Sequence, residues 1–326
     1  MQSSSAIRRG RRVVATFVTI VVALGVLASS AWSTTNSSVK IKNLSDLEAA
    51  VTSAQSLTVF PSSQMGRLIH GIGLASYQGA CQSVQTDSAQ VNKHCWFGSA
   101  TSNEIVVLFG DSEAGMWLPT FIALARLEHF KLFAAARKAC PLAALPAYPT
   151  YAGECATWKS NAIKYINSLH PRIVVMDEKD VGYNVDPRTP SAATPIFSAG
   201  LRSALEAVHA PTKIMLSAMP YYNPANRMPI DPATCIKKVL TDKLPLTVCD
   251  TPVSRAFVLS RLKADNSAAA LAGVHIVSVE PLFCAQVNCP VAINGQLAWS
   301  NRFHTPVWYA TMVTDAMESL LKPFGL

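Results

Sequence analysis

Charged residues are scarce in this chain of 326 residues, because they make up 15% of the sequence while hydrophobic residues make up 50%. That balance excludes a disordered tail, a charged coiled coil and a low-complexity scaffold. The length suits two domains or one large α/β domain. Half of the net charge of +8 comes from four arginines, Arg8, Arg9, Arg11 and Arg12. No clustered basic stretch follows them, so we expect no nucleic-acid partner.

Several binding motifs are also missing. No glycine-rich phosphate loop follows the first predicted strand, which argues against a nucleotide or dinucleotide site. The cysteines lack the paired Cys-x-x-Cys spacings of a zinc site, although His94-Cys95 keeps that alternative open. We therefore expect neither a metal nor an organic cofactor.

The N-terminal segment has no acidic residue before Asp46 and no charge at all between Val13 and Ala31. An apolar run of this length behind four arginines is typical of a membrane-spanning signal anchor with its N-terminus in the cytoplasm. Small residues at 28–31 leave a cleaved signal peptide as the alternative. Both alternatives export the remainder. We assign residues 1–38 to this anchor or signal, 39–100 to a helical, disulfide-tied lead-in, and 101–326 to an α/β domain.

The cysteine content agrees with export, because eight cysteines, an even number, are typical of a disulfide framework. Eight cysteines allow 105 connectivities, but successive cysteines enclose short segments here, which favours pairing between sequence neighbours. The predicted disulfides are Cys81–Cys95, Cys140–Cys155, Cys235–Cys249 and Cys284–Cys289.

From Ser102 onward, short β-branched runs alternate with longer helical patterns, as in a parallel sheet covered by helices on both faces. The fold class that this order predicts is a three-layer α/β/α sandwich with a five-stranded parallel sheet. The predicted strands are 105–109, 132–136, 172–176, 213–217 and 275–279, and the predicted helices are 114–129, 155–169, 195–209, 252–272 and 306–321. Pro-rich loops at 141–151 and 220–232 follow the second and fourth strands, so we expect them to wall a site at the carboxyl edge of the sheet.

The most informative motif is Gly110-Asp111-Ser112, which directly follows the first predicted strand and precedes a helix. This placement exposes the Ser112 hydroxyl at the sheet edge and beside a helix N-terminus, where developing negative charge is stabilised. Asp111 or Ser112 as a plain helix cap is the alternative. The flanking strand and helix favour a nucleophile.

A serine nucleophile needs a base, and His304 is the best placed histidine. It directly precedes the last predicted helix, with Pro306 at a first-turn position. Because that helix follows the fifth strand, its leading loop reaches the same sheet edge as Ser112 and can accept the serine proton. A purely structural histidine is the alternative for His304 taken by itself.

These residues together resemble the SGNH (GDSL-like) hydrolase superfamily, and in particular the exported SGNH domain that accompanies bacterial membrane acyltransferases. The resemblance covers roughly residues 75 to 322 and extends to Trp117, Cys140-Pro141, Cys155, Cys235, Cys249 and Cys289-Pro290. It implies a carbohydrate esterase or O-acyltransferase with Ser112 as nucleophile and His304 as base. It also implies an orienting aspartate three residues before the histidine.

Two positions depart from the family pattern. Glu113 stands where a histidine commonly follows the serine, and Asn301 stands where the aspartate is expected. An amide can accept the imidazole N–H through its oxygen, but it adds no charge, and its NH2 would select the wrong tautomer. A backbone carbonyl, or one of the carboxylates at positions 177, 180 and 186, is the alternative orienting group.

Further site residues follow from the same resemblance. The Ser112 N–H is the first oxyanion-hole donor, and Asn184 is the second candidate, although neither the family's glycine after the second strand nor its Gly-x-Asn-Asp block is intact. We expect the substrate to be contacted by residues near the site rim. These are Asp111, Glu113, Trp117, Tyr221, Tyr222 and Trp299, and core packing is the alternative for at least half of the aromatic ones.

The sequence therefore predicts a serine enzyme outside the cytoplasm that hydrolyses or transfers an acyl group, with acetyl expected, on cell-envelope carbohydrate through an acyl-serine intermediate. Its expected partners are an acylated envelope polysaccharide or other glycan, the membrane through the N-terminal segment, and a membrane acyltransferase. The alternative function is a non-catalytic envelope protein of the same fold that binds glycan or the acyltransferase.

Overall fold

The computed structural model describes residues 39–62, 65–66, 81–83, 90–145, 152–179 and 190–326. By its internal contacts the chain divides into two units, Met1–Thr35 and Asn36–Leu326, and the described residues all belong to the second. Within them no helix is both long and apolar enough to cross a membrane. The predicted membrane segment lies outside the described residues.

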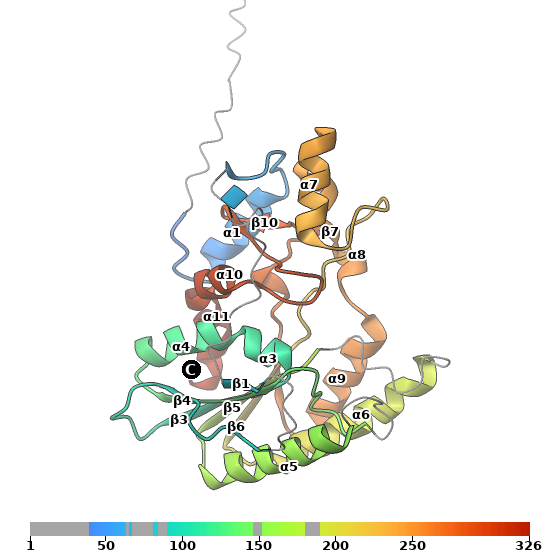
Figure 1. Ribbon diagram of the computed structural model, residues 1–326. Coiled ribbons are helices and arrows are strands. Elements are labelled where there is room, and N and C mark those ends of the chain that lie inside the picture. The colour runs from blue at the N-terminus through green and yellow to red at the C-terminus, as the bar shows by residue number, and fades with distance from the viewer. Residues whose placement is uncertain (1–38, 63–64, 67–80, 84–89, 146–151, 180–189) are drawn as a thin grey trace, which may run out of the picture. The chain divides into compact units, whose positions relative to one another are not determined.

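A mostly parallel sheet forms the centre of the fold (Figure 1). Its order is β1-β4-β3-β5-β6-β8, and β2 pairs antiparallel with β4. The strands are β1 Gln82–Ser83, β2 Trp96–Gly98, β3 Ile105–Gly110, β4 Lys131–Arg137, β5 Ile173–Asp177, β6 Thr212–Leu216 and β8 His275–Val277. The five predicted strands are confirmed, and the predicted strand number is too low because β1 and β2 extend the β4 edge.

Helices cover both faces of this sheet, which confirms the three-layer prediction (Figure 1). One layer contains α3 Ser112–Met116, α4 Leu118–Leu127, α10 Val307–Met312 and α11 Thr314–Leu321. The other contains α5 Ala152–Ser168, α6 Pro190–Ala207 and α9 Leu259–Leu271. The central strands β3 and β5 are buried almost throughout, because their unbroken apolar sequences are covered from both sides.

Some of the predicted helices are interrupted in the structure. The predicted helix 114–129 is divided at Trp117 into α3 and α4, and the last helix is divided at Val313. One helix was not predicted: α7, Pro232–Asp242, begins where the side chain of Asp231 accepts a hydrogen bond from the Thr234 N–H. The Asp-Pro pair that starts it is an ordinary helix-initiation signal.

The lead-in packs on the same core as the sheet. Helix α1, Leu44–Ala54, buries Leu47 and Val51, and it contacts α11. The remaining short elements are α8 Val253–Ala256, β7 Thr251–Pro252, β9 Asn288–Cys289, β10 Ala292–Ile293, β11 Gln296–Leu297 and the 3-10 helices η3 Leu246–Cys249, η4 Glu280–Leu282 and η5 Lys322–Phe324.

All four predicted disulfides are present, which confirms the neighbour pairing. Cys140–Cys155 closes the loop between β4 and α5, and Cys235–Cys249 ties α7 to η3. Cys81–Cys95 holds the segment around β1 and β2, and Cys284–Cys289 closes a short turn. Each disulfide therefore stabilises a loop close to its own position in the sequence.

Candidate active site

The turn after β3 brings Ser112 to the carboxyl edge of the sheet. Gly110 has φ +155°, and a Cβ at this position would lie 1.8 Å from the Asp177 carbonyl oxygen of β5. Only glycine fits so close an approach between neighbouring strands. Asp111 then caps α3, because its Oδ1 accepts the Glu113 N–H at 2.8 Å. Ser112 is thereby fixed as the first residue of α3.

The structure brings Ser112 and His304 together across 192 residues of sequence. His304 lies in the loop between β11 and α10, and its Nε2 is 3.0 Å from Ser112 Oγ. Its Nδ1 is 3.0 Å from Asn301 Oδ1. The three predicted catalytic residues therefore form a continuous Ser–His–Asn relay, in the geometry of an activated nucleophile.

The orientation of the Asn301 amide decides whether this relay works. Asn301 Oδ1 also accepts the Phe303 backbone N–H at 2.8 Å. A backbone N–H can only donate, so it requires the amide oxygen, and not the NH2, on the side that faces His304. His304 must therefore carry its proton on Nδ1 and present a bare Nε2 to the Ser112 hydroxyl. This is the tautomer that a general base needs.

The environment of His304 keeps its ring neutral. Burial is the main effect that lowers its pKa to about 4, and the positive charges of Lys179 and Lys138 lower it further. Asn301 provides an acceptor without a negative charge, so it offers no compensation for an imidazolium. The His304 ring is thus neutral at any pH well above 4.

A group of buried carboxyl groups lies on the other side of Ser112. Asp177 Oδ2 accepts the Trp117 Nε1–H at 2.9 Å, while burial first and the Asp111 charge second raise the pKa of Asp177 well above its usual value. Burial raises the pKa of Glu178 to about 7, with Asp111 again the second cause. Asp177 is bound to Trp117 and is not the group that orients His304. Asp180 and Asp186 lie outside the described residues.

A comparison with protein-family models identifies the family of the chain. The family model described as the SGNH domain fused to AT3 domains matches residues 80–319. The chain belongs to this SGNH family. The match confirms the resemblance that the Gly-Asp-Ser motif, the terminal histidine and the cysteines carry.

Two solved structures resemble the chain at low sequence identity, and the first of them shows the same fold. The periplasmic domain of the lipopolysaccharide acetyltransferase from Salmonella ser. Paratyphi A is 15% identical, with a TM-score of 0.52 over 85% of this chain and 98% of that chain. The carbohydrate acetylesterase Est24 from Sinorhizobium meliloti is 10% identical, with a TM-score of 0.40 over 68% of this chain and 99% of that chain. The comparison with curated proteins gives no match.

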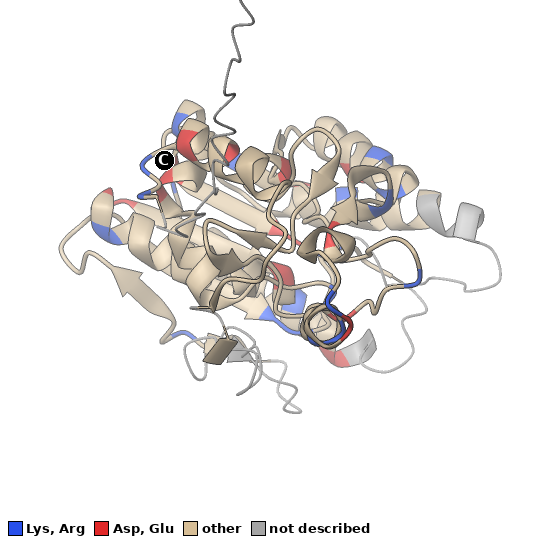
Figure 2. Ribbon diagram, turned by 90° about the horizontal axis from the view of Figure 1, so that it is seen from above, with Lys and Arg blue, Asp and Glu red and all other residues tan. Residues whose placement is uncertain are grey.

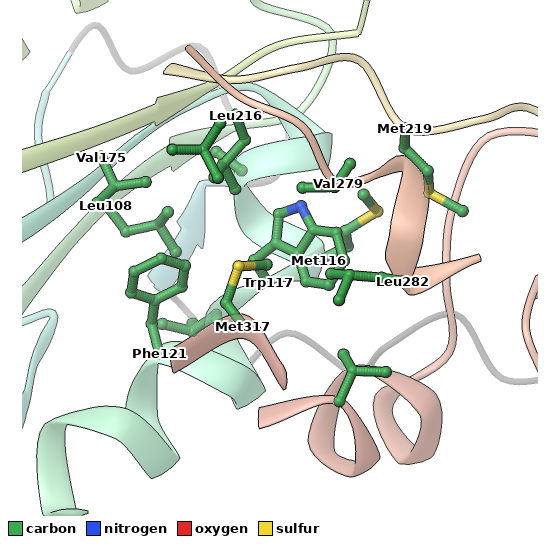
Figure 3. Packing of buried hydrophobic residues seen from close by; sticks show 14 of the residues in the cluster. Leu108, Met116, Trp117, Phe121, Val175, Leu216, Met219, Val279, Leu282 and Met317 are labelled. Carbon is green, nitrogen blue, oxygen red and sulfur yellow. The ribbon is translucent and has the colours of Figure 1, made fainter. Parts of the chain in front are cut away.

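Several predicted substrate contacts of this SGNH domain prove to be buried. Trp117 and Trp299 are both 0% exposed. The Trp117 ring packs among Met116, Leu282 and Met317 (Figure 3), and Trp299 Nε1 donates to the Pro220 carbonyl at 2.8 Å. These two side chains are part of the core and cannot stack on a sugar.

The other rim predictions need a similar correction. Tyr222 is 0% exposed and packs against the Trp299 ring. Asp111 is fully buried as the cap of α3, and Glu113 is 3% exposed, so neither carboxylate reaches a substrate. Tyr221 alone among the predicted contacts is partly exposed, and its ring lies 6.4 Å from that of Phe303.

Only part of the predicted oxyanion hole lies within the described residues. Asn184 lies outside the described residues. After β4, Ala139 has φ +56° in a turn closed by the Cys140 N–H and the Arg137 carbonyl, 3.2 Å apart. An alanine therefore adopts here the left-handed backbone that favours glycine, as the family's glycine at this point suggests. Among the described residues no group of His, Cys, Asp and Glu side chains is arranged to hold a metal ion.

The residues that position His304 and Asn301 were not predicted from the sequence. Phe303 supplies the N–H that orients Asn301, and Ser300 donates both its N–H and its hydroxyl to the His304 carbonyl, at 2.8 and 3.0 Å. The Lys179 ammonium lies 3.6 Å from the centre of the Phe303 ring. The position of Lys179 just after a strand end was the available signal, since sites form at that edge.

Proposed function

We propose that this SGNH domain is a serine esterase or O-acyltransferase that acts outside the cytoplasm on acyl esters of carbohydrate, with acetyl the expected acyl group. The observation that carries the proposal is the relay of Ser112, His304 and Asn301, in which the Phe303 N–H selects the productive tautomer of the base. A non-catalytic binding protein of the same fold has no need for a hydroxyl, a bare imidazole nitrogen and an oriented amide in one line.

In the first half-reaction the Ser112 oxygen bonds to the ester carbonyl carbon while the serine proton passes to His304 Nε2. The tetrahedral intermediate then collapses, the bond to the sugar oxygen breaks, and that oxygen takes the proton from Nε2. In the second half-reaction a water or another sugar hydroxyl gives its proton to Nε2 and attacks the acyl-serine. Ser112 recovers its proton, and free acid or a new ester leaves.

Backbone N–H groups at the nucleophile turn are the donors for the oxyanion in this proposal. The Ser112 N–H is one. The turn at Ala139 is the second, because β4 runs beside β3 in parallel register, with Gly110 opposite Ala136. The Ala139 turn therefore continues the same sheet edge from which Ser112 projects. Asn184, the second donor predicted from the sequence, lies outside the described residues and remains a candidate.

The cellular setting has separate support. Four disulfides favour an oxidising compartment, and the arginine-flanked apolar run favours an N-terminal membrane anchor. The similar Salmonella structure is described as a periplasmic acetyltransferase domain. An acylated envelope glycan is the proposed substrate, and a membrane acyltransferase is the proposed partner that supplies or receives the acyl group.

The test is covalent labelling of the full-length protein with a serine-directed fluorophosphonate, followed by mass spectrometry of the labelled peptide. We expect the label on Ser112, loss of the label in Ser112→Ala, and slower labelling in His304→Ala. Ser168→Ala, which removes an exposed hydroxyl on α5, should label normally. If Ser112 stays unlabelled while the protein is folded and releases no acid from acetylated sugars, the enzyme proposal is wrong.

A further inference from the structure

Two lysines flank the nucleophile at the same level of the sheet. Gly110 of β3 pairs with Ala136 of β4 on one side and with Asp177 of β5 on the other. Lys138 and Lys179 each come two residues after these partners, as Ser112 comes two residues after Gly110. The lysines therefore follow the two strands adjacent to that of Ser112, one on either side of the nucleophile.

Their positions relative to His304 agree with this placement. The Lys179 backbone N–H donates to Asp111 Oδ2 at 3.1 Å, and this hydrogen bond holds the Lys179 backbone beside the turn that carries Ser112. Its ammonium then lies over Phe303, the residue next to His304. Both lysine charges act on the His304 ring and disfavour its protonation. The two cations are thus close enough to the reacting atoms to act on a bound substrate.

A third cation stands on the base side of the site. The Arg302 guanidinium carbon lies 5.3 Å from the centre of the Phe303 ring and 5.3 Å from that of Tyr221. Its Nε is buried and finds no hydrogen-bond partner within the described part of the chain. Lys179 and Arg302 therefore gather around one aromatic ring, that of the residue next to His304.

Among the described residues, the acidic groups near the site do not offset this charge at the surface. Asp111, Glu113, Asp177 and Glu178 are at most 3% exposed, and burial raises the pKa of Asp177 and Glu178. Elsewhere Lys and Arg residues lie on several helices and loops together with Asp and Glu residues (Figure 2). Cations that cluster over a buried reacting centre repel one another, and an anion between them relieves that repulsion.

We propose that the carbohydrate substrate of this site is anionic, with a carboxylate or phosphate group near the acylated hydroxyl that Lys138, Lys179 and Arg302 bind. This inference rests on the proposed function and specifies its substrate class. Arginine suits either anion because its planar N–H groups can bind two oxygens at once, whereas the lysines act as point charges. The aromatic rings of Tyr221 and Phe303 lie next to these cations and suit the apolar face of a sugar ring.

The test uses three mono-O-acetylated methyl glycosides that differ only at C6, which is a hydroxymethyl, a carboxylate or a phosphate ester. For the full-length protein we expect kcat/KM for acetate release to be about tenfold higher for at least one anionic sugar than for the neutral one. High salt should reduce this preference. The two anionic sugars distinguish an acidic sugar from a phosphorylated one.

Substitutions of the lysines test whether these cations cause the preference for anionic sugars. Lys138→Gln and Lys179→Gln should each lower the anionic-to-neutral ratio of kcat/KM about three- to fivefold, the effect of one partly exposed charge pair. Lys263→Gln, which removes the same charge from exposed α9, should leave the ratio unchanged. Protection of Ser112 from the fluorophosphonate by unacetylated glycosides provides a binding readout that needs no turnover.

Two results would overturn the inference while leaving the proposed function intact. One is an equal kcat/KM, and equal protection, for all three sugars. The other is an equal loss in Lys138→Gln and Lys179→Gln with every sugar, because the lysines would then stabilise the oxyanion and not the substrate. Failure of the proposed function looks different, since no sugar would release acetate and Ser112 would not be labelled.

Discussion

The two residues of the proposed catalytic pair, Ser112 and His304, come from regions that are built in different ways. Ser112 follows an almost fully buried strand and stands on a turn that only glycine can make, next to carboxyl groups shielded from water. His304 belongs to an irregular loop that is half exposed, whose local hydrogen bonds set the ring and whose neighbours are cations. Packing thus fixes the nucleophile, whereas hydrogen bonds and charge adjust the base. Substitutions on the first side should affect folding, and substitutions on the second side should affect rate and pH dependence.

The largest expected effect is on the nucleophile side, in Gly110→Ala. The added Cβ would lie 1.8 Å from the Asp177 carbonyl and 2.8 Å from the Ala114 Cβ, so two packed segments must move apart. We expect a loss of more than about 4 kcal/mol in the free energy of unfolding, or no folded protein. Chemical denaturation of the variant and the wild-type protein measures this difference in the free energy of unfolding.

Gly273→Ala is the matched control for that experiment. Gly273 also has a positive φ, +63°, but a Cβ there meets nothing within 4 Å. It should cost only about 1 to 2 kcal/mol, the ordinary penalty of a left-handed residue. Equal losses in the two variants would mean that backbone conformation, and not the contact between β3 and β5, makes Gly110 necessary.

Asn301→Ala addresses the base side. Without the amide oxygen nothing selects the tautomer with the proton on Nδ1, so kcat should fall roughly a hundredfold, a smaller effect than the loss of a charged triad member. The melting temperature should change little, because Asn301 is partly exposed. A large loss of stability with kcat unchanged would mean that the amide serves the loop and not the reaction.

Asn301→Asp is expected to act in the opposite direction. A carboxylate accepts from both Phe303 N–H and His304 Nδ1, as the amide oxygen does, and its charge stabilises the imidazolium that forms in the transition state. We expect kcat/KM at pH 7 to rise by about tenfold. A decrease would show that the loop around His304 tolerates no negative charge beside the ring.

The smallest expected effect concerns the pH dependence of kcat/KM, namely the pH at which activity is lost on the acid side. Because the pKa of His304 is lowered to about 4, the base stays neutral as the pH falls through 6.5, and kcat/KM should decline only near pH 4. In Asn301→Asp the new charge raises the pKa of His304, so this pH should move upward by a unit or more. If kcat/KM of the wild-type protein already declined near pH 6.5, the pKa of His304 would not be lowered by burial.

The same difference between the two sides explains what the sequence could predict. The five predicted strands were identified from short β-branched runs, several of which are unbroken apolar runs typical of strands covered on both faces. Ser112 was found because it directly follows one of them. The short strands β1 and β2 have no such pattern, since they exist only by pairing with β4. Helix α7 had a readable Asp-Pro start inside a region that was interpreted as loop.

The site rim was harder to predict for a physical reason. Trp117 and Trp299 stand close in sequence to catalytic residues, yet their side chains point into the core, and sequence proximity carries no direction. The role of Asn301 depends on one backbone N–H from Phe303, a group that every non-proline residue has. Lys138 and Lys179 became neighbours of Ser112 only through the register of three strands.

The four disulfides span only 14, 15, 14 and 5 residues, whereas the catalytic pair spans 192. No described covalent link therefore joins the serine to its base, and a nascent chain contains the nucleophile long before it contains the histidine. Until β8 has added to the sheet and the following loop has folded back, Ser112 is an ordinary alcohol. Chains that are incomplete or only partly folded would for that reason be unable to attack esters, whether or not their disulfides had already formed.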